Sequence, residues 1–569
     1  MNPFLEEIVE KTAAAGGLDP STVRGLLAVP PEESMGDYAL PCFVLAKELR
    51  RNPAQIAADV AARIEPETGP GGRIAAVAAS GPYVNFSLHR PAFIGHTLDE
   101  IAAPGREYGT RGQGAGRTVA IDFSSPNLAR PFSIAHLRST AIGHAIYRIH
   151  EFLGWGCVGI NHLGDYGANF GQLLAAYAAW GDDERILADP IRELVGLYVR
   201  FNREAEEHPE LRDRARDCLR ALAAGDDEMI RLWRWFSEEG RKEAERIYGI
   251  LGVRFDETLG ESHYAGRLDD VIAFFEERGL AEESEGALIV PLEDQPAPLM
   301  LRTSNGTSTY HSRDLAALLY RHRRHGFDKM VYVTDKRQSL HFEQLFGALR
   351  RAGVDWIDRC EHAPFGLMSF RGRALATRKG EVIILEEVLD KAIALTEGII
   401  ADKNPDLAGA AEVARQVGIS AVVFADVNNR RTRDINFSLE EVLNFDGETG
   451  PYVQYTHARY CSILRRHGRP ADPAADTGRL GEDGEMRLAR KLSEFPGVVE
   501  SAAEENEPSY VAGYLLELAT AANKLYNEVP VLVDEDEELT AARVRLVDGA
   551  RGVLRTGLDL LGMSAPEEM

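Results

Sequence analysis

A strand, a tight loop and a helix start follow one another between residues 118 and 140, and this run strongly constrains the fold. Residues 118–123 read TVAIDF, a β-branched pattern typical of a buried strand, and the loop after them carries Pro126 and Asn127 but no glycine. A helix is expected to begin near His136. Because the first backbone N–H groups of a helix have no partner within it, they attract phosphate. The run therefore predicts an α/β fold with a nucleotide site at this junction.

The side chains around this junction suit a triphosphate under attack at its α-phosphorus. His136 can donate a hydrogen bond, Arg130 is a fixed cation, and Ser139 and Thr140 are small donors. Positioned donors of this kind stabilise the negative charge that develops in such a transition state. The alternative is an ordinary strand-to-helix junction with a capping serine and a structural histidine, and these residues alone leave both interpretations open.

Further strand patterns alternate with helical patterns as far as about residue 375, which predicts a doubly wound parallel (Rossmann-like) sheet. Such a sheet binds nucleotides at the carboxyl ends of its strands. A long charged helical run at 190–251 interrupts the alternation and is expected to pack on one side as an insertion. The strands expected in the sheet are 118–123, 158–160, 287–292 and 330–334.

Three domains are expected: an N-terminal α/β domain at 1–112, the doubly wound domain at 113–380 and an all-helical domain at 381–569. A Gly/Arg-rich stretch at 104–117 is the linker between the first two. The first domain is expected to hold helices at 43–49 and 53–64, the second of them capped by Asn52, and a strand at 83–88. In the last domain, 468–484 is expected to be a loop, and the predicted core residues are Leu488, Leu492, Phe495, Tyr514, Leu515, Leu518, Ala522 and Leu525.

Composition bears on compartment and partners. The five cysteines lack CxxC spacing, so neither a zinc site nor a disulfide framework is indicated. No apolar window approaches the roughly 18 residues of a membrane span, and the start of the chain lacks a basic region before an apolar run, which predicts a soluble, cytoplasmic protein with no membrane partner. The net charge of −25 is unexpected for a nucleic-acid binder, but basic clusters at 321–324 and 430–433 can act locally.

A series of motifs runs in order along the chain. The segment SSPNLARPFSIAHLRST stands at 124–140, and others lie at 161–167, 170–171, 310–314, 338–342, 377–380, 447–459 and 565–569. The first resembles the "HIGH" signature of class I aminoacyl-tRNA synthetases, in the wording used by the arginyl-tRNA synthetases. Because the matches cover essentially the whole chain in the right order, they are far more specific together than any one motif.

The resemblance implies a class I catalytic domain between a tRNA-contacting N-terminal domain and a helical anticodon-binding domain. It implies an arginine–tRNA ligase, in which ATP and L-arginine form arginyl-adenylate and a terminal ribose hydroxyl of tRNA(Arg) then takes the arginyl group. Mg²⁺ is expected to enter bound to ATP, with no metal site in the protein itself. The chain is expected to act as a monomer.

The residues that match the arginine pocket of the family supply carboxylate, amide and hydroxyl groups, which a planar guanidinium requires as paired acceptors. They are Asp122, Asn127, Tyr310, Asp314 and Gln338. Two of them have other interpretations: Asp122 could cap the loop after its strand, and Asp314 could be the N-cap of a helix.

By the same resemblance, His136 is the second histidine of the signature and binds the triphosphate, with Arg130 and Ser133 as neighbouring catalytic groups. His162, taken alone, is more often a satisfied loop histidine, and His341 is expected on the adenine side near the backbone of 333–335. The expected ATP-binding residues are Ser125, Pro126, Phe132, His136, His162, Gly164, Asp165 and His341.

Contacts with tRNA are implied at both ends of the chain. Tyr38, in the turn MGDY, resembles the family's reader of the D-loop, because unpaired bases stack on aromatic rings; the alternative is that its ring packs under the sheet. The motif GPYVQYTHAR at 450–459 implies anticodon contacts by Tyr452, Gln454, Tyr455 and Arg459.

Both class I signatures depart from the usual pattern. Ser133 stands in place of the first signature histidine and Ala135 in place of the glycine before the second. The second signature, usually KMS-x-[RK], reads RALATRKG at 373–380, where Arg378 and Lys379 are the catalytic cations expected for the pyrophosphate. These departures leave two alternatives: a paralogue that activates arginine or an analogue for another pathway, and a non-catalytic RNA-binding regulatory protein.

Overall fold

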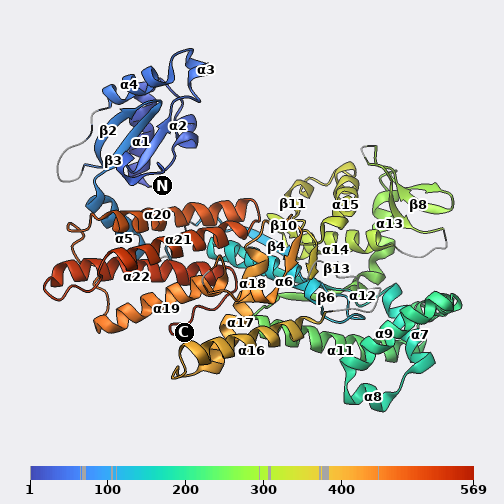
Figure 1. Ribbon diagram of the computed structural model, residues 1–569. Helices are drawn as coiled ribbons and strands as arrows, with labels where there is room; N and C mark the ends of the chain where they lie inside the picture. The colour runs from blue at the N-terminus through green and yellow to red at the C-terminus, as the bar shows by residue number, and fades with distance from the viewer. Residues whose placement is uncertain are drawn as a thin grey trace.

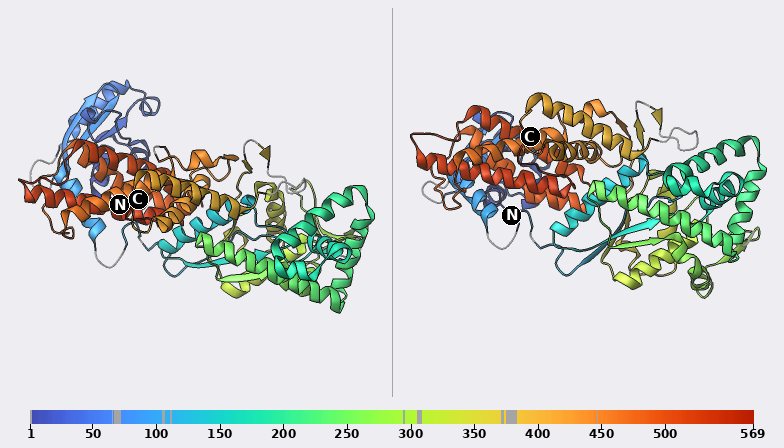
Figure 2. Two further views of the ribbon diagram at one scale, coloured as in Figure 1. Left: turned by 60° about the horizontal axis from the view of Figure 1, so that its bottom comes forward. Right: turned by 90° about the horizontal axis from the view of Figure 1, so that it is seen from below.

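The computed structural model shows an elongated molecule in which the N-terminal unit lies beside the C-terminal helices and a helical insertion occupies the opposite end (Figures 1 and 2). The described residues are 2–64, 66, 72–103, 107–110, 112–293, 295–304, 309–370, 373–374, 383–445 and 447–569. Within these ranges no helix is both long and apolar enough to cross a membrane.

The centre of the molecule is a five-stranded parallel sheet, as the sequence predicts. Its strands are β4 (Thr118–Asp122), β5 (Gly156–Leu163), β6 (Glu257–Gly260), β10 (Lys329–Tyr332) and β11 (Cys360–His362). The order β11-β10-β4-β5-β6 reverses between β4 and β10, where Asp122 pairs with Tyr332. In a doubly wound sheet the binding crevice opens at the carboxyl ends of the strands on either side of this switch point.

The strand predicted at 287–292 does not belong to this sheet, so that assignment is wrong. It is β8 (Ala287–Val290), which pairs antiparallel with β7 (Glu282–Ser284) and β9 (Leu299–Arg302). Glu285 and Gly286 both have positive φ, 50° and 79°, and two such residues make a hairpin turn whose twist matches its strands. The short, polar strands β6 and β11 also belong to the parallel sheet and are not predicted from the sequence.

Helix α6 (Ile134–Phe152) follows β4 and packs almost flush against it. A Cβ atom at Gly143 would lie only 2.1 Å from the Cβ of Phe123, so only glycine permits this approach. The buried face of the helix includes Ile142, Ile146 and Ile149. Close packing fixes the helix N-terminus over the carboxyl end of β4, where the nucleotide site is predicted.

Further helices flank the sheet and form the insertion. The flanking helices are α12 (Glu261–Tyr264), α13 (Leu268–Glu276), α14 (Tyr310–His325) and α15 (Ser339–Arg351). The run predicted at 190–251 is three helices, α9 (Pro190–Glu207), α10 (Glu210–Ala223) and α11 (Asp227–Leu251), and the insertion also includes α7 (Ala168–Trp180) and α8 (Asp183–Ala188). These five share a hydrophobic core of their own, around Phe170, Phe201 and Phe236.

The N-terminal unit contains helices around an antiparallel sheet of order β1-β3-β2. Asn52 caps its helix as predicted, accepting a hydrogen bond from the backbone N–H of Ala54. The helix predicted at 43–49 is shorter, because residues before Ala46 form a turn. Its elements are α1 (Pro3–Gly16), α2 (Pro20–Leu26), β1 (Tyr38–Pro41), α3 (Ala46–Leu49), α4 (Pro53–Arg63), β2 (Ile74–Ser80) and β3 (Tyr83–Leu88), and α5 (Arg90–Ala102) leads out of it.

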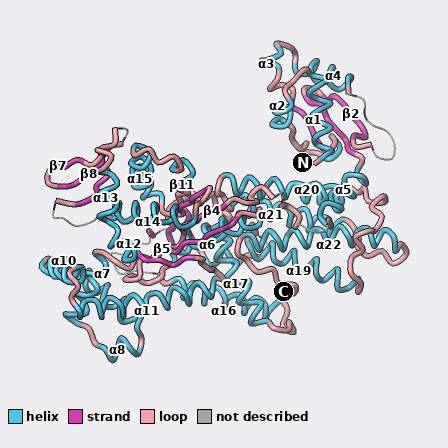
Figure 3. The backbone as a smooth tube through the Cα atoms, turned by 180° about the vertical axis from the view of Figure 1, so that it is seen from behind, coloured by secondary structure: helices cyan, strands magenta, loops and turns pink. Residues whose placement is uncertain are grey.

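The C-terminal part is a set of helices that lie side by side (Figure 3). The predicted apolar residues are all buried, and the predicted loop separates α19 from α20. The helices are α16 (Leu385–Lys403), α17 (Ala410–Val427), α18 (Leu439–Val442), α19 (Gly450–His467), α20 (Asp483–Glu504), α21 (Ser509–Glu528) and α22 (Glu537–Leu560). A small sheet of order β13-β12-β14 is formed by β12 (Met368–Phe370), β13 (Arg373–Ala374) and β14 (Ile435–Phe437).

Candidate active site

A cavity of about 1020 Å³ opens at the switch point of the parallel sheet. All five predicted arginine-binding residues line it, together with most of the predicted ATP-binding residues. The predicted residues in its wall are Asp122, Ser125, Asn127, Arg130, Ser133, His136, His162, Gly164, Tyr310, Asp314, Gln338 and His341. Side chains that are far apart in the sequence therefore meet in one site.

The turn after β4 is strained and held by hydrogen bonds. Ser124 and Ser125 have φ values of 65° and 47°, a left-handed conformation that costs a non-glycine residue about 1–3 kcal/mol. The Ser124 backbone N–H donates to Ser139 Oγ at 2.9 Å, and Thr140 Oγ1 donates to Ser124 Oγ at 2.8 Å. Ser139 and Thr140, expected as donors to the triphosphate, thus hold the turn in place.

At the start of α6, Ser133 and His136 cap the helix. The Ser133 backbone N–H donates to Nδ1 of His136 at 3.0 Å, so the hydrogen-bond network places the ring proton on Nε2. Burial, and then the positive charge of Arg130, lower the pKa of His136 to about 4. His136 is therefore a neutral hydrogen-bond donor at neutral pH, and the capping serine of the alternative interpretation is present in the same site.

On the opposite side, two histidines surround Asp314. His341 Nε2 donates to Asp314 Oδ2 at 2.7 Å, and His162 Nε2 lies 3.6 Å from Asp314 Oδ1. Burial by itself would raise the pKa of Asp314, but the His341 hydrogen bond and the neighbouring positive charges hold it below the ordinary value. Thr309 is the N-cap of α14, so Asp314 is not a helix cap. His341 thus lies beside the predicted arginine-binding carboxylate, in the wall of the same cavity as residues 333–335.

Asp122, at the end of β4, has both oxygens engaged. Its Oδ2 lies 2.8 Å from Nη1 of Arg321, and its Oδ1 accepts a hydrogen bond from Ser125 Oγ at 2.6 Å. Ser125 Oγ in turn accepts from the backbone N–H of His162 at 3.0 Å. Asp122 therefore does cap the loop after its strand, as the alternative interpretation holds, while it also lines the cavity.

The charged residues in the wall that were not predicted as site residues include Glu261 and Arg313. Arg313 Nε lies 2.9 Å from Glu261 Oε2, and burial raises the pKa of Glu261 to about 7 despite this cation. Asp165 positions this pair, because its carboxylate accepts hydrogen bonds from the N–H and hydroxyl of Ser262 at the start of α12. An isolated Glu in a polar stretch carries no sequence signal for a site, and only the spatial cluster identifies it.

Three predicted ATP-binding residues lie behind the wall of the cavity. Asp165 supports α12, Phe132 packs its ring 5.1 Å from that of His136, and the carbonyl of Pro126 accepts a hydrogen bond from Gly164 N–H at 3.0 Å. These contacts position residues of the wall and do not reach into the cavity. Arg378 and Lys379 lie outside the described residues.

The predicted tRNA-binding residues divide into exposed and buried ones. Tyr455 is 41% exposed, and Arg459 stacks between the rings of Tyr455 and Tyr526, 4.8 Å from each. Gln454 is fully buried and donates to the carbonyl of Ser564, so its side chain is not free for RNA. Tyr38 is only 7% exposed and packs in the core under its sheet, which the alternative interpretation describes. Tyr452 is half-buried.

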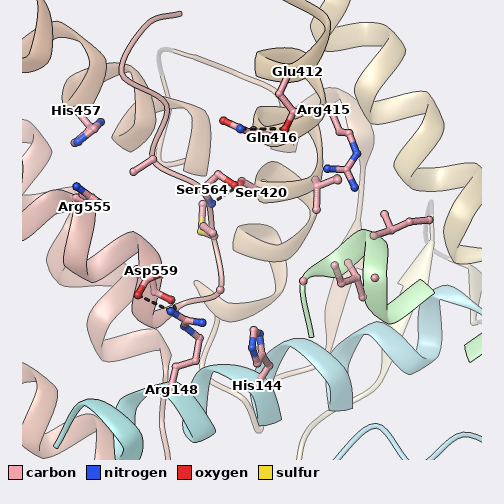
Figure 4. A pocket seen from close by; sticks show the side chains of 18 of the residues that line it. His144, Arg148, Glu412, Arg415, Gln416, Ser420, His457, Arg555, Asp559 and Ser564 are labelled. Atoms are coloured by element: carbon pink, nitrogen blue, oxygen red, sulfur yellow. Dashed lines mark hydrogen bonds and ion pairs between the residues drawn. The ribbon is translucent and has the colours of Figure 1, made fainter. Parts of the chain in front are cut away.

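A second cavity of about 540 Å³ lies between α6, α17, α22 and the C-terminal tail (Figure 4). His144 points into it from α6, and Arg148 pairs with Asp559 at its edge. Its wall holds three arginines and three carboxylates, so it carries no net charge for a ligand: Arg148, Arg415 and Arg555 against Glu412, Asp559 and Glu567. Among the described residues, no group of three or more His, Cys, Asp and Glu side chains is placed to hold a metal ion.

A switch-point cavity of this kind, capped by a signature helix, is the site of a class I aminoacyl-tRNA synthetase. The family model for "tRNA synthetases class I (R), catalytic domain" matches residues 97–439, with the "Arginyl tRNA synthetase N terminal domain" at 4–88 and the "DALR anticodon binding domain" at 453–569. The chain belongs to the arginyl-tRNA synthetase family.

Relatives and solved structures agree over the full length. An arginine–tRNA ligase of Alkaliphilus metalliredigens is 42% identical over 100% of both chains, and arginine–tRNA ligase 1 of Bacillus cereus is 45% identical over 100% of this chain and 98% of its own. The structure of Thermus thermophilus arginyl-tRNA synthetase matches with a TM-score of 0.81 at 29% identity, again over 100% of both chains.

Proposed function

We propose that this chain charges tRNA(Arg) with L-arginine at the expense of ATP. An oxygen of the arginine α-carboxylate attacks the α-phosphorus of ATP and pyrophosphate leaves, giving arginyl-adenylate. A terminal ribose hydroxyl of tRNA then attacks the carbonyl carbon, loses its proton, and AMP leaves. The observation that carries the proposal is the placement of an ionised carboxylate, Asp314, opposite the capped N-terminus of α6 in one cavity.

In this proposal Asp314 receives the guanidinium of the substrate. A carboxylate in a partly dehydrated site attracts a cation far more strongly than one in water. Tyr310 lies at the mouth, 56% exposed, and Asn127 and Gln338 add amide groups, while Asp122 forms the floor. The pair of Glu261 and Arg313 closes the same side.

On the other side, the N-terminus of α6 and its neighbours receive the triphosphate. The Nε2–H of His136 donates to phosphate oxygen without carrying a charge, and Arg130 supplies the fixed cation. Arg130 is held by a hydrogen bond of 3.2 Å to Asn169 Oδ1. Mg²⁺ is proposed to enter with ATP, where it would neutralise phosphate charge.

The patch of Tyr455, Arg459 and Tyr526 is proposed to hold anticodon bases, because exposed rings beside a guanidinium stack on bases of any sequence. In the N-terminal unit, the exposed rings of Phe43 and Tyr83, 5.8 Å apart, are better placed than Tyr38 to meet an unpaired base. The enzyme is proposed to act as a monomer in the cytoplasm.

Charging of total tRNA with labelled arginine tests the function. We expect ATP-dependent incorporation of arginine and of no other amino acid, together with arginine-dependent release of pyrophosphate. Pyrophosphate release without transfer to tRNA would favour a paralogue of another pathway. The absence of both would favour a non-catalytic RNA-binding protein, which no observation now supports.

A further inference from the structure

Arg321, on α14, is buried beneath the arginine side of the cavity. Its side chain is 1% exposed, and its Nη1 lies 2.8 Å from Oδ2 of Asp122 and 3.3 Å from the hydroxyl of Tyr332. A buried guanidinium is tolerated only where a carboxylate and further acceptors meet it. Here the protein places its own guanidinium against one of the two carboxylates expected to bind the guanidinium of the substrate.

This contact changes the charge that a substrate meets. Asp122 is neutralised by Arg321, and its second oxygen is already bonded to Ser125. Glu261 is matched by Arg313. Asp335, also in the wall, is matched by Arg337. Among the described residues, Asp314 is therefore the carboxylate of the wall whose ion-pair partners are histidines and not an arginine. Its negative charge is the complement of a single guanidinium.

We propose that Arg321 is a positioning residue that sets the charge of the arginine pocket: it neutralises Asp122, so that Asp314 is the carboxylate left for the substrate. The inference rests on the proposed function. It assigns Asp122 a supporting role, since the Asp122 carboxylate holds Arg321 and the turn at Ser125. Asp314 faces the cavity from about two turns earlier on the same helix, between His162 and His341.

The inference predicts an unusual rescue. Asp122→Asn leaves Arg321 as an unpaired cation beside the site for a second guanidinium, so the arginine KM is expected to rise about a hundredfold. Adding Arg321→Met removes that cation, and the double variant is expected to return to within about fivefold of the parent. If Asp122 itself bound the substrate guanidinium, removal of Arg321 would not restore the arginine KM.

The experiment measures the arginine and ATP KM values of the full-length enzyme by arginine-dependent pyrophosphate exchange with tRNA present, for D122N, R321M and the double variant. D314N alone and D314N/R321M are the matched controls, and no rescue is expected for them. R324M, an exposed position on the same helix, controls for the loss of an arginine from α14. Thermal unfolding shows which variants are folded, and the ATP KM is expected to stay within about twofold.

A folded D122N/R321M variant that is as defective for arginine as D122N overturns the inference, as does a rescue of D314N by R321M. Should D122N not fold alone, the double variant decides: a near-parental arginine KM supports the inference and a large increase overturns it. Failure of the parent to charge tRNA with arginine would instead refute the proposed function, so the two failures are distinguishable.

Discussion

The arginine side and the phosphate side of the active-site cavity differ in the kind of polar group that they offer to a substrate. The arginine side is built from ionised side chains that are already paired or hydrogen-bonded, with Asp314 fixed by His341 and Asp122 fixed by Arg321. The phosphate side is built from a helix N-terminus, a neutral His136 and the cation Arg130. The guanidinium of arginine is therefore expected to bind to side chains that are already charged, whereas the phosphates of ATP are expected to bind mainly to hydrogen-bond donors.

We infer that the arginine side determines which amino acid is selected and that the phosphate side determines the rate of adenylate formation. Fixed charge in a partly dehydrated pocket discriminates between amino acids in the ground state, because a missing or extra charge leaves a buried group unpaired. Neutral donors at a helix N-terminus gain most when negative charge develops on the phosphate in the transition state. Changes on the arginine side should therefore appear in the arginine KM, and changes on the phosphate side in the rate.

The largest effect is expected from Asp314→Ala. Its loss removes the carboxylate opposite the guanidinium and should cost about 2–5 kcal/mol of binding, which is about thirtyfold to several thousandfold in the arginine KM. The ATP KM should stay within about twofold, measured by arginine-dependent pyrophosphate exchange. A folded variant with parental arginine dependence would remove Asp314 from the site.

His136→Ala should slow adenylate formation about a hundredfold, the scale of one lost electrostatic donor, while the arginine KM changes less than about threefold. His136→Gln retains an N–H and is the matched control, with a smaller loss of rate. Because the pKa of His136 is about 4, neither variant should alter the pH dependence of the rate between pH 6 and 8. A rise in the arginine KM as large as the loss of rate would contradict the division of the cavity into a side that selects arginine and a side that sets the rate.

Tyr526→Ala changes the proposed tRNA-binding patch, which lies outside the cavity. Loss of one stacking ring should cost about 1–3 kcal/mol in tRNA affinity, seen as a rise in the tRNA KM during charging. Both the arginine and ATP KM values should stay parental, because the ring lies on α21, away from the cavity wall. Gln454 is buried, so Gln454→Ala is the control for a change that affects only the structure of the helical domain. An unchanged tRNA KM for Tyr526→Ala would contradict the role of this patch in tRNA binding.

The smallest effect concerns pH. The pKa of Glu261 is about 7 in the folded protein, so its carboxylate gains a proton below that pH and the arginine side loses negative charge. The kcat/KM for arginine should therefore rise severalfold from pH 6 to pH 8, and Glu261→Gln should flatten the profile. The kcat/KM for ATP should not follow this titration. A Glu261→Gln profile identical to that of the parent would contradict the role of Glu261.

Glu261 and His136 change the free energy of unfolding in opposite directions as the pH rises. The pKa of Glu261 is raised by folding, so the unfolded state holds fewer protons and the free energy of unfolding decreases as pH rises from about 4.5 to about 7. The pKa of His136 is lowered by folding, so its contribution is lost as pH falls from about 6.5 to about 4.

Much of the fold could be predicted, because the strand–loop–helix junction at β4 and the alternation after it follow directly from sequence periodicity. The errors have local causes. An apolar pattern such as that of β8 is the same in a hairpin strand as in a strand of a parallel sheet. The strands β6 and β11 are too short and too polar to be predicted from an apolar pattern. Gln454 and Tyr38 were assigned to RNA from their motifs, but motif position says nothing about which face of an element is buried.

From the sequence, only those site residues could be predicted that lie in motifs of the family. Asp122, Asn127, Tyr310, Asp314 and Gln338 came from resemblance, and the fold brings them into one cavity. Glu261 carries no sequence signal. Arg313 lies in the motif at 310–314 and Arg321 in the basic cluster at 321–324, but neither is predicted to lie at the site, because charges within helices usually mark solvent-exposed faces. Their importance follows from burial and pairing across elements that are far apart in the chain.

The most direct test of the account compares arginine with citrulline, which has nearly the same shape but a neutral ureido group. Pyrophosphate exchange should proceed with arginine at a kcat/KM at least about a thousandfold higher than with citrulline, since a site built around buried charge rejects the uncharged analogue. Comparable values for the two amino acids would contradict the claim that Asp314 and its preformed charge select the substrate.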